Sequence, residues 1–284
     1  MIKMFDTHAH YNDEIYNDDR EKVFSDMYAN GVTHVTLIGA SLKDSKSEKE
    51  IVNKYKSISN IPTLYYTIGD HPDEIPKFTP YSVEGVSYLN ELELLCKDES
   101  GKVDAIAIGE IGMDYHGDFK TEEDFKNQER WFIAEIELAK KLNLPIVIHS
   151  RDACQITYDI VKQHASGVGG IVHCFSYDKE IAKEYIKLGF HIGIGGTVTF
   201  KNGRKVKEVV ENIPIESIVT ETDAPWLAPT PFRGKRNQSA YISYVIEEIA
   251  RLKNMDIEKA ADILYNNAFN VYKIIRGKNE SREI

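Results

Sequence analysis

Four histidines and two carboxylates stand where apolar runs of the sequence end. His8 and His10 close the first run, MIKMFDTHAH, and residues two apart in an extended strand point to the same face. The remaining residues each follow a later apolar run, and they are Glu110, His149, His173 and Asp223. Imidazole nitrogens and carboxylate oxygens are common ligands of divalent metal ions. These residue types therefore predict a metal centre, provided that the fold brings the ends of the runs together.

The number of these residues points to two ions rather than one. A catalytic zinc site usually has three protein ligands and an open position, so six ligands exceed its need. We therefore expect two divalent ions, of zinc, manganese or magnesium, about 3.5 to 4 Å apart and bridged by Glu110. A water between such ions loses a proton near neutral pH and becomes a nucleophile, and Asp223 can orient or deprotonate it. One ion would be held by His8, His10 and Asp223, and the other by His149 and His173.

Eight strand-like runs supply these positions. Segments with helix-like spacing separate the runs, most clearly over residues 124–143, where apolar side chains fall on one stripe. Strand alternating with helix favours a parallel sheet, and eight such units in about 250 residues favour a closed (β/α)8 TIM barrel. Residues 254–277 predict extra C-terminal helices. The eight runs cover residues 1–8, 33–39, 63–69, 103–110, 144–150, 169–175, 190–195 and 217–222.

A barrel of this kind carries its chemistry at the carboxyl ends of its strands, so the six ligands would converge on one rim. His34 and His191 lie at strand starts and are expected to be structural. His71 lies just past a strand end, on the active side, and is a candidate for substrate contact. His116 has a similar position and the same two interpretations, substrate contact or support for a ligand.

Cations and aromatic residues near the expected rim are candidates for contacts with an anionic substrate. Arg151 follows His149 and could hold a phosphate oxygen, although an ion pair with a helix acid is the alternative. Arg233, Lys235 and Arg236 follow the eighth strand, where a solvated basic turn is the alternative. Aromatic side chains could offer faces to unpaired bases, and they are Tyr115, Phe175, Tyr177, Phe200, Trp226 and Phe232.

Composition limits the class of protein. The 284 residues are expected to form one domain over 1–277 with a polar tail over 278–284. The formal charge of -10 does not suit binding along a duplex, so metal ions would supply positive charge locally. Three cysteines without CxxC spacing favour a reducing compartment. No apolar run approaches the roughly 18 residues of a membrane span, and we expect a soluble cytoplasmic protein whose oligomeric state the sequence does not indicate.

Eight motifs together resemble one known family. In chain order they are DTHAH, GDHP, GEIGMDYH, PIVIHSRDA, VHCFS, IGGTVTF, ETDAPWLAP and RGKRN. Their order and spacing, over roughly residues 4 to 275, resemble the TatD family of metal-dependent deoxyribonucleases in the amidohydrolase-like superfamily. The resemblance implies a (β/α)8 fold, divalent-metal DNase activity, often as a 3′ to 5′ exonuclease on single strands, and the six ligands above. Met113 and Gln238 depart from the family pattern, and neither is an expected ligand.

Two other functions stay open. The first is a metallohydrolase of small amides or lactones, since related barrels use a similar site on carbonyl substrates. Several of those bridge their metals with a carboxylated lysine on the fourth strand, where this chain has Glu110. The second is a non-catalytic binding protein, which the complete ligand set argues against. DNA, as single strands or frayed 3′ ends, is the expected substrate.

Overall fold

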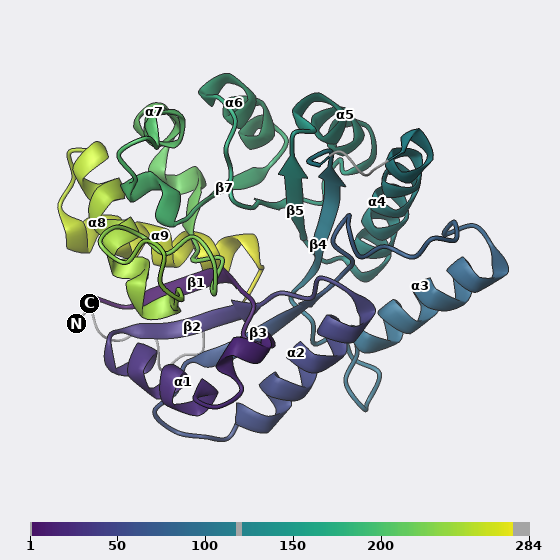
Figure 1. Cartoon of the computed structure of the whole chain (residues 1–284), viewed down its shortest axis with the longest axis horizontal. Coiled ribbons are helices and arrows are strands. Elements are labelled where there is room, and N and C mark those ends of the chain that lie inside the picture. The colour runs from purple at the N-terminus through teal and green to yellow at the C-terminus, as the bar shows by residue number, and fades with distance from the viewer. Residues whose placement is uncertain (1, 118–120, 275–284) are drawn as a thin grey trace.

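Eight parallel strands form one sheet in which each strand pairs with the next along the chain, from β1 to β8 (Figure 1). The structure is a computed structural model, and it describes residues 2–117 and 121–274. It confirms the predicted (β/α)8 barrel. The strands are β1 (Met4–Ala9), β2 (Val32–Leu37), β3 (Thr63–Ile68), β4 (Ala107–Asp114), β5 (Ile146–Arg151), β6 (Gly170–Val172), β7 (Phe190–Ile194) and β8 (Ile218–Thr220).

Helices alternate with the strands and surround them (Figure 1). They are α1 (Arg20–Ala29), α2 (Leu42–Tyr55), α3 (Val83–Leu95), α4 (Glu122–Leu142), α5 (Cys154–His164), α6 (Lys179–Lys187), α7 (Arg204–Asn212), α8 (Ile242–Leu252) and α9 (Ile257–Val271). Short 3-10 turns are η1 (Glu14–Tyr16), η2 (Gly196–Thr199), η3 (Ile215–Ser217) and η4 (Ser239–Tyr241). The helix predicted over 124–143 is α4, which begins at a capping box of Thr121 and Asp124. Both α8 and α9 follow β8 at the C-terminal end.

The barrel closes between β8 and β1 just beyond the end of β8. The backbone N–H of Asp223 donates to the His8 carbonyl at 2.9 Å, and the N–H of His10 donates to the Ala224 carbonyl at 2.7 Å. The Thr7 hydroxyl adds a bond to the Thr220 carbonyl at 3.1 Å. These bonds hold the two histidines of the first strand beside the loop that carries Asp223.

Apolar side chains fill the interior of the barrel toward the amino-terminal ends of the strands. A buried cluster contains Phe5, Ala107, Val147, Ile171 and Val219, from β1, β4, β5, β6 and β8. The cluster joins β1 and β8 to β4, β5 and β6 on the far side of the barrel, so it lies inside the barrel. Side chains in a strand alternate between faces, so the residues two further along also point inward, nearer the carboxyl ends. These residues are His149 on β5, His173 directly after β6 and Glu221 directly after β8.

Most strand ends differ from their predicted positions by one to three residues, but the fourth strand is shifted by four. We expected residues 103–110, but β4 spans Ala107–Asp114. Val103 instead forms an isolated bridge with Lys97, and the chain stays extended through Gly112, whose added Cβ would lie 2.0 Å from the His149 carbonyl oxygen. Glycine thus permits the close approach of β4 and β5, and Glu110 lies within a strand rather than at its end.

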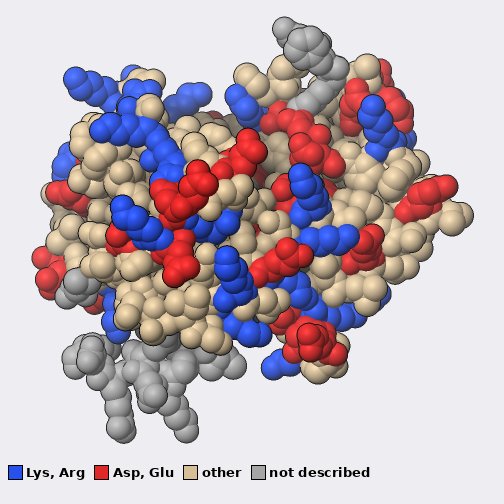
Figure 2. All heavy atoms as spheres, turned by 60° about the horizontal axis from the view of Figure 1, so that its bottom comes forward, with Lys and Arg blue, Asp and Glu red and all other residues tan. Residues whose placement is uncertain are grey.

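The surface carries charges of both signs. On the face drawn in Figure 2, acidic and basic side chains are interspersed across the middle of the molecule. A polyanion approaching this face would depend on local groups of cations. Within the described residues, every helix is too short or too polar to cross a bilayer. The predicted tail over 278–284 lies outside the described residues, and the single-domain boundary at 277 stays a prediction.

Candidate metal centre

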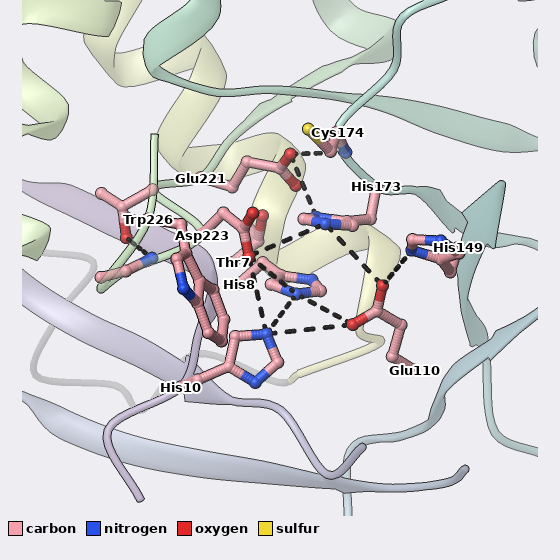
Figure 3. Close-up of polar contacts among 12 residues, drawn as sticks. Thr7, His8, His10, Glu110, His149, His173, Cys174, Glu221, Asp223 and Trp226 are labelled. Atoms are coloured by element: carbon pink, nitrogen blue, oxygen red, sulfur yellow. Dashed lines mark hydrogen bonds and ion pairs between the residues drawn. The ribbon is translucent and has the colours of Figure 1, made fainter. Parts of the chain in front are cut away.

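The six predicted ligands meet at the carboxyl ends of the strands (Figure 3). His8 and His10 come from β1 and the residue after it, and their Nε2 atoms lie 3.1 Å apart. The rings of His8 and His173 stack with 3.4 Å between centroids. Described side chains form four groups here that could hold a metal ion. Two share His8, and they are His8, His10 and Glu110, and His8, His173 and Asp223. The other two are His71, Asp114 and His149, and His173, Cys174 and Glu221.

Glu110 lies between two pairs of histidines. Its Oε2 is 3.4 Å from His8 Nε2 and 3.9 Å from His10 Nε2. Its Oε1 is 2.8 Å from His149 Nδ1 and 3.8 Å from His173 Nε2. Each carboxylate oxygen thus faces a different pair, which is the arrangement that a bridging ligand requires.

Asp223 approaches the same histidines from the loop after β8. Its Oδ1 lies 3.6 Å from His10 Nε2, 3.8 Å from His8 Nε2 and 3.9 Å from His173 Nε2. Its backbone has a φ of 56°, in the left-handed region that non-glycine residues seldom adopt. Side-chain exposure is 17% for Asp223 and 4% for Glu110, so Asp223 is the more accessible carboxylate.

The carboxylates of the centre attract positive charge strongly. Burial opposes the ionisation of Glu110, but the imidazoles of His173 and His8 outweigh it and hold the pKa of Glu110 well below its usual range. Burial also lowers the pKa of His173, yet Glu221 and Glu110 overcome this effect and raise it to about 10. For His149, hydrogen bonds to Asp114 and Glu110 overcome burial and raise the pKa to about 9. Divalent cations would satisfy these carboxylates and the converging imidazole nitrogens together, so the residues fit metal ions.

Two further carboxylates, Glu221 and Asp114, contact the ring nitrogens of His173 and His149 that point away from Glu110. Glu221 is fully buried, and its Oε1 lies 3.2 Å from His173 Nδ1 and accepts the Cys174 backbone N–H at 2.7 Å. Asp114 Oδ2 lies 2.9 Å from His149 Nε2. Sequence reasoning did not assign either residue. The strand alternation offered a signal, because Glu221 stands two residues before Asp223 and Asp114 stands four residues after Glu110.

A cavity of about 1060 Å³ opens over the centre. Arg151 lies at the end of β5 and lines the cavity, exposed and without an ion pair to any described carboxylate. His71 also lines it, and its Nδ1 accepts the Asp73 backbone N–H at 3.1 Å. Burial lowers the pKa of His71 to about 4, so the ring is neutral and carries its hydrogen on Nε2.

The three basic residues predicted after the eighth strand have two different environments. Arg236 donates to Asp19 at 2.6 and 2.9 Å and to the Ile15 carbonyl at 2.8 Å. It is thus engaged in holding the loop to η1 and is not directed to the cavity, so we leave it out of the proposed substrate contacts. Arg233 and Lys235 are exposed on the outer part of the same loop and do not line the cavity.

The six aromatic candidates, all within the described residues, have different surroundings. Trp226 lines the cavity with 50% of its surface exposed and contacts His10 with 5.1 Å between ring centroids. Phe175 is buried in the core. Tyr115 packs against Phe125, and the Tyr177 hydroxyl lies 2.9 Å from the Ser150 hydroxyl. Phe200 and Phe232 are half-buried outside the cavity.

The remaining histidines follow the polarity of the barrel. His34 is buried at the start of β2, where Thr33 and Tyr265 hydroxyls lie 2.9 and 3.0 Å from its Nδ1. His191 is half-buried at the start of β7. His116 pairs with Asp152 at 2.8 Å, and both side chains are more than half exposed.

A (β/α)8 barrel with imidazoles and carboxylates gathered at the carboxyl ends of its strands defines a barrel metallohydrolase. Residues 5–273 match the family model described as TatD related DNase, and the chain belongs to the TatD family.

Relatives agree with this assignment. The chain is 41% identical over 272 residues to YabD of Bacillus subtilis (strain 168), named an uncharacterized metal-dependent hydrolase, covering 95% of this chain and 99% of that protein. MJ1582 of Methanocaldococcus jannaschii has the same description and is 35% identical over 275 residues. The match covers 96% of this chain and 98% of that protein. The crystal structure of YjjV, a TatD homologue from Escherichia coli K12, superposes with a TM-score of 0.84 at 25% identity, covering 96% and 99%. The chain is accordingly a metal-dependent hydrolase.

Proposed function

We propose that this protein is a deoxyribonuclease that uses two divalent metal ions to hydrolyse phosphodiester bonds of single-stranded DNA or frayed 3′ ends. The observation that carries the proposal is the position of Glu110, whose two oxygens face separate pairs of histidines. One ion would be held by His8, His10 and Asp223, the other by His149 and His173, with Glu110 between them. When bound, such ions lower the pKa of a water molecule and screen charge on a phosphoryl oxygen.

The side chains around the ligands have separate tasks in this proposal. Asp223 accepts the proton of the attacking water at its carboxylate, which is the more exposed of the two central acids. His71 donates its Nε2–H to a non-bridging phosphate oxygen, because Nδ1 is already occupied as an acceptor. Arg151 places its guanidinium beside the same phosphate group, where charge-assisted hydrogen bonds are strong. The family resemblance supports 3′ to 5′ cleavage, and the three free cysteines support a cytoplasmic location.

The test is a metal series on labelled DNA. Protein stripped of metal and supplied with zinc, manganese or magnesium is incubated with 3′-labelled and 5′-labelled single strands, with a blunt duplex, and with a panel of amides and lactones. We expect metal-dependent release of nucleotides from the 3′ end of single strands. Cleavage of amides or lactones without cleavage of DNA would support the alternative metallohydrolase, and metal binding without any turnover would support a binding protein.

Two substitutions probe the roles of the acids. Glu110→Gln should abolish hydrolysis and lower bound metal from about two ions to one or fewer per chain, because the bridge is lost. Asp223→Asn should keep the fold and reduce turnover severely, because an amide does not accept the proton. Glu74→Gln, on the exposed wall of the same cavity, is the matched control and should change neither quantity. Full metal content with normal turnover in Glu110→Gln would exclude the bridging role.

A further inference from the structure

The walls of the cavity differ in charge from one side to the other. On the side formed by the loops after β1, β2 and β3, one cation, Lys43, stands among the described carboxylates of the wall. These carboxylates are Asp13, Glu14, Asp44 and Glu74. A nucleic-acid strand leaving the metal centre across this side would bring its phosphates toward like charges, which is unfavourable.

The adjoining side of the cavity, next to the loop after β1, is formed by the loops after β7 and β8, which pack directly on each other. An added Cβ at Gly196 would lie 2.1 Å from the Leu227 carbonyl oxygen, and the Thr230 backbone N–H donates to the Thr199 hydroxyl at 2.8 Å. Thr197 from the first loop and Trp226 from the second both line the cavity. The surface of these two loops is thus continuous with the wall of the site. We name it the β7–β8 shelf and define it by Phe200, Lys201, Trp226, Arg233 and Lys235.

The cations of the shelf are free to meet an anion. Lys201, Arg233 and Lys235 are exposed and form no ion pair with any carboxylate in the described parts of the chain. The Arg233 guanidinium lies over the Phe200 ring, 4.1 Å from its centroid, so its other face and its N–H edges are open. Lys235 is held over Phe232 at 5.9 Å. By contrast, Arg236 in the same loop is paired with Asp19.

The shelf also offers an aromatic face at the edge of the cavity. Trp226 presents half of its surface to solvent, while its ring contacts His10 at a steep angle of 62° (Figure 3). An unpaired base can stack on such a ring without sequence preference, whereas a base inside a duplex does not expose its face.

We propose that the β7–β8 shelf binds the stretch of single-stranded DNA that continues away from the cleaved phosphate. This inference rests on the proposed nuclease function and adds the path of the strand. The first base beyond the metal centre stacks on Trp226, and the next phosphates lie against Arg233 and Lys201. The acidic side of the cavity is left to water.

The test compares binding of short and long strands. Phosphorothioate oligothymidylates, which resist cleavage, are titrated by fluorescence anisotropy as a dinucleotide and as an octanucleotide. The dinucleotide has one phosphate, which the metal centre takes, so it has no further phosphate to place against Arg233 and Lys201. The double variant Lys201→Gln/Arg233→Gln should weaken the octanucleotide about tenfold and leave the dinucleotide unchanged. Its log–log salt slope should become less steep by about 1.4, at about 0.7 per lost phosphate contact on a single strand.

The control is Lys43→Gln/Lys46→Gln, which removes the same charge from α2. Lys43 lines the acidic side of the cavity, and Lys46 lies outside the cavity, where it pairs with Glu91. This control variant should alter neither affinity. The shelf proposal would be overturned if both double variants lost the same octanucleotide affinity. It would also be overturned if Lys201→Gln/Arg233→Gln weakened the dinucleotide and the octanucleotide equally. The proposal would also be overturned if Lys201→Gln/Arg233→Gln left the octanucleotide affinity unchanged, or if it weakened binding of a blunt duplex as much as binding of the octanucleotide.

Tryptophan fluorescence gives an independent readout. The chain has two tryptophans, and Trp131 is fully buried, so quenching by an added strand reports on Trp226. We expect quenching by the octanucleotide and its absence in Trp226→Phe, and unquenched emission at saturation would contradict stacking. Hydrolysis of unmodified oligonucleotides by the wild-type protein is scored separately. Its absence would refute the nuclease proposal, while the binding comparison would still decide whether the shelf holds a strand.

Discussion

At the scale of single residues, Glu221 orients His173, one of the proposed metal ligands. Its carboxylate lies against His173 Nδ1 and the Cys174 N–H, so His173 presents Nε2 to Glu110 and Asp223. Partners of this kind fix the ring orientation and increase the basicity of a ligating histidine. Glu221 is therefore a positioning residue.

We expect Glu221→Gln to weaken the binding of one of the two metal ions by about 10-fold to 100-fold, because the amide keeps the size of the side chain and removes its charge. Titration of metal-free protein with zinc against a chromogenic chelator measures this affinity. Glu180→Gln on the surface of α6 is the control. Two unchanged zinc affinities in Glu221→Gln would assign the carboxylate a purely structural role.

Gly193 offers a second way to disturb the same carboxylate. An added Cβ at this position would lie 2.4 Å from Glu221 Oε2 and 2.9 Å from its Cδ. The fully buried Glu221 has little room to move, so Gly193→Ala should lower zinc affinity in the same direction as Glu221→Gln. If Gly193→Ala lost stability but kept both zinc affinities, the link between Gly193 and the metal centre would be refuted.

At the scale of elements, α9 covers the amino-terminal end of the barrel. The Phe269 ring contacts Phe5 and His34, with 5.3 and 4.8 Å between centroids, and the Tyr272 hydroxyl donates to the Thr7 carbonyl at 2.7 Å. These contacts join α9 to the apolar layer inside the strands. The proposed metal ligands lie toward the other end of the same strands, so we expect stability and metal binding to be separated along the barrel axis.

This separation predicts the effect of Phe269→Ala. The side chain is 3% exposed, and its removal should lower the free energy of unfolding by about 3 to 5 kcal/mol. Phe269→Leu should cost less, since it leaves a smaller cavity. Urea denaturation gives the stability, and metal content of the folded protein should be unchanged in both variants. A loss below about 1 kcal/mol for Phe269→Ala would show that α9 does not close the barrel core.

At the scale of the whole molecule, buried acids make stability depend on pH. The Asp70 backbone N–H donates to Glu135 Oε1 at 2.9 Å, and Asp70 Oδ1 accepts the Tyr88 hydroxyl at 2.8 Å. Burial raises the pKa of Asp70 to about 7 and holds that of Glu135 well above its usual range. In the unfolded chain both groups ionise near pH 4. Between about pH 4 and 7 the folded state therefore binds more protons, so the free energy of unfolding falls as pH rises.

We expect Asp70→Asn to flatten this fall, because an amide does not ionise. Asp70 accounts for up to about 4 kcal/mol between pH 4 and 7, by 1.36 kcal/mol per unit of pKa. Denaturation by urea at pH 5 and at pH 7.5 measures the difference for wild type and variant, with Glu180→Gln, exposed on α6, as control. The same pH dependence in wild type and Asp70→Asn would show that Asp70 is already ionised at neutral pH in the folded protein.

Much of the metal centre was predictable because its rules are local. The two-residue repeat of a strand follows from backbone geometry, so it puts His8 and His10 on one side without knowledge of the fold. Alternating strand and helix favour a parallel barrel, and this topology collects strand ends on one rim. The six proposed ligands could therefore be placed together from residue types and positions. In the structure five of them form two groups that share His8, and His149 joins them through Glu110.

The sequence by itself thus determined which residue types stand at the ends of the strands and the barrel that collects them. Only the tertiary structure decided which partners they meet, because those contacts join residues far apart in the chain. Arg236 pairs with Asp19, 217 positions away, and is diverted from the cavity. Glu221 meets Cys174 across 47 positions and supports a ligand. The acidic wall and the β7–β8 shelf likewise depend on how separate loops pack, which neither periodicity nor composition records.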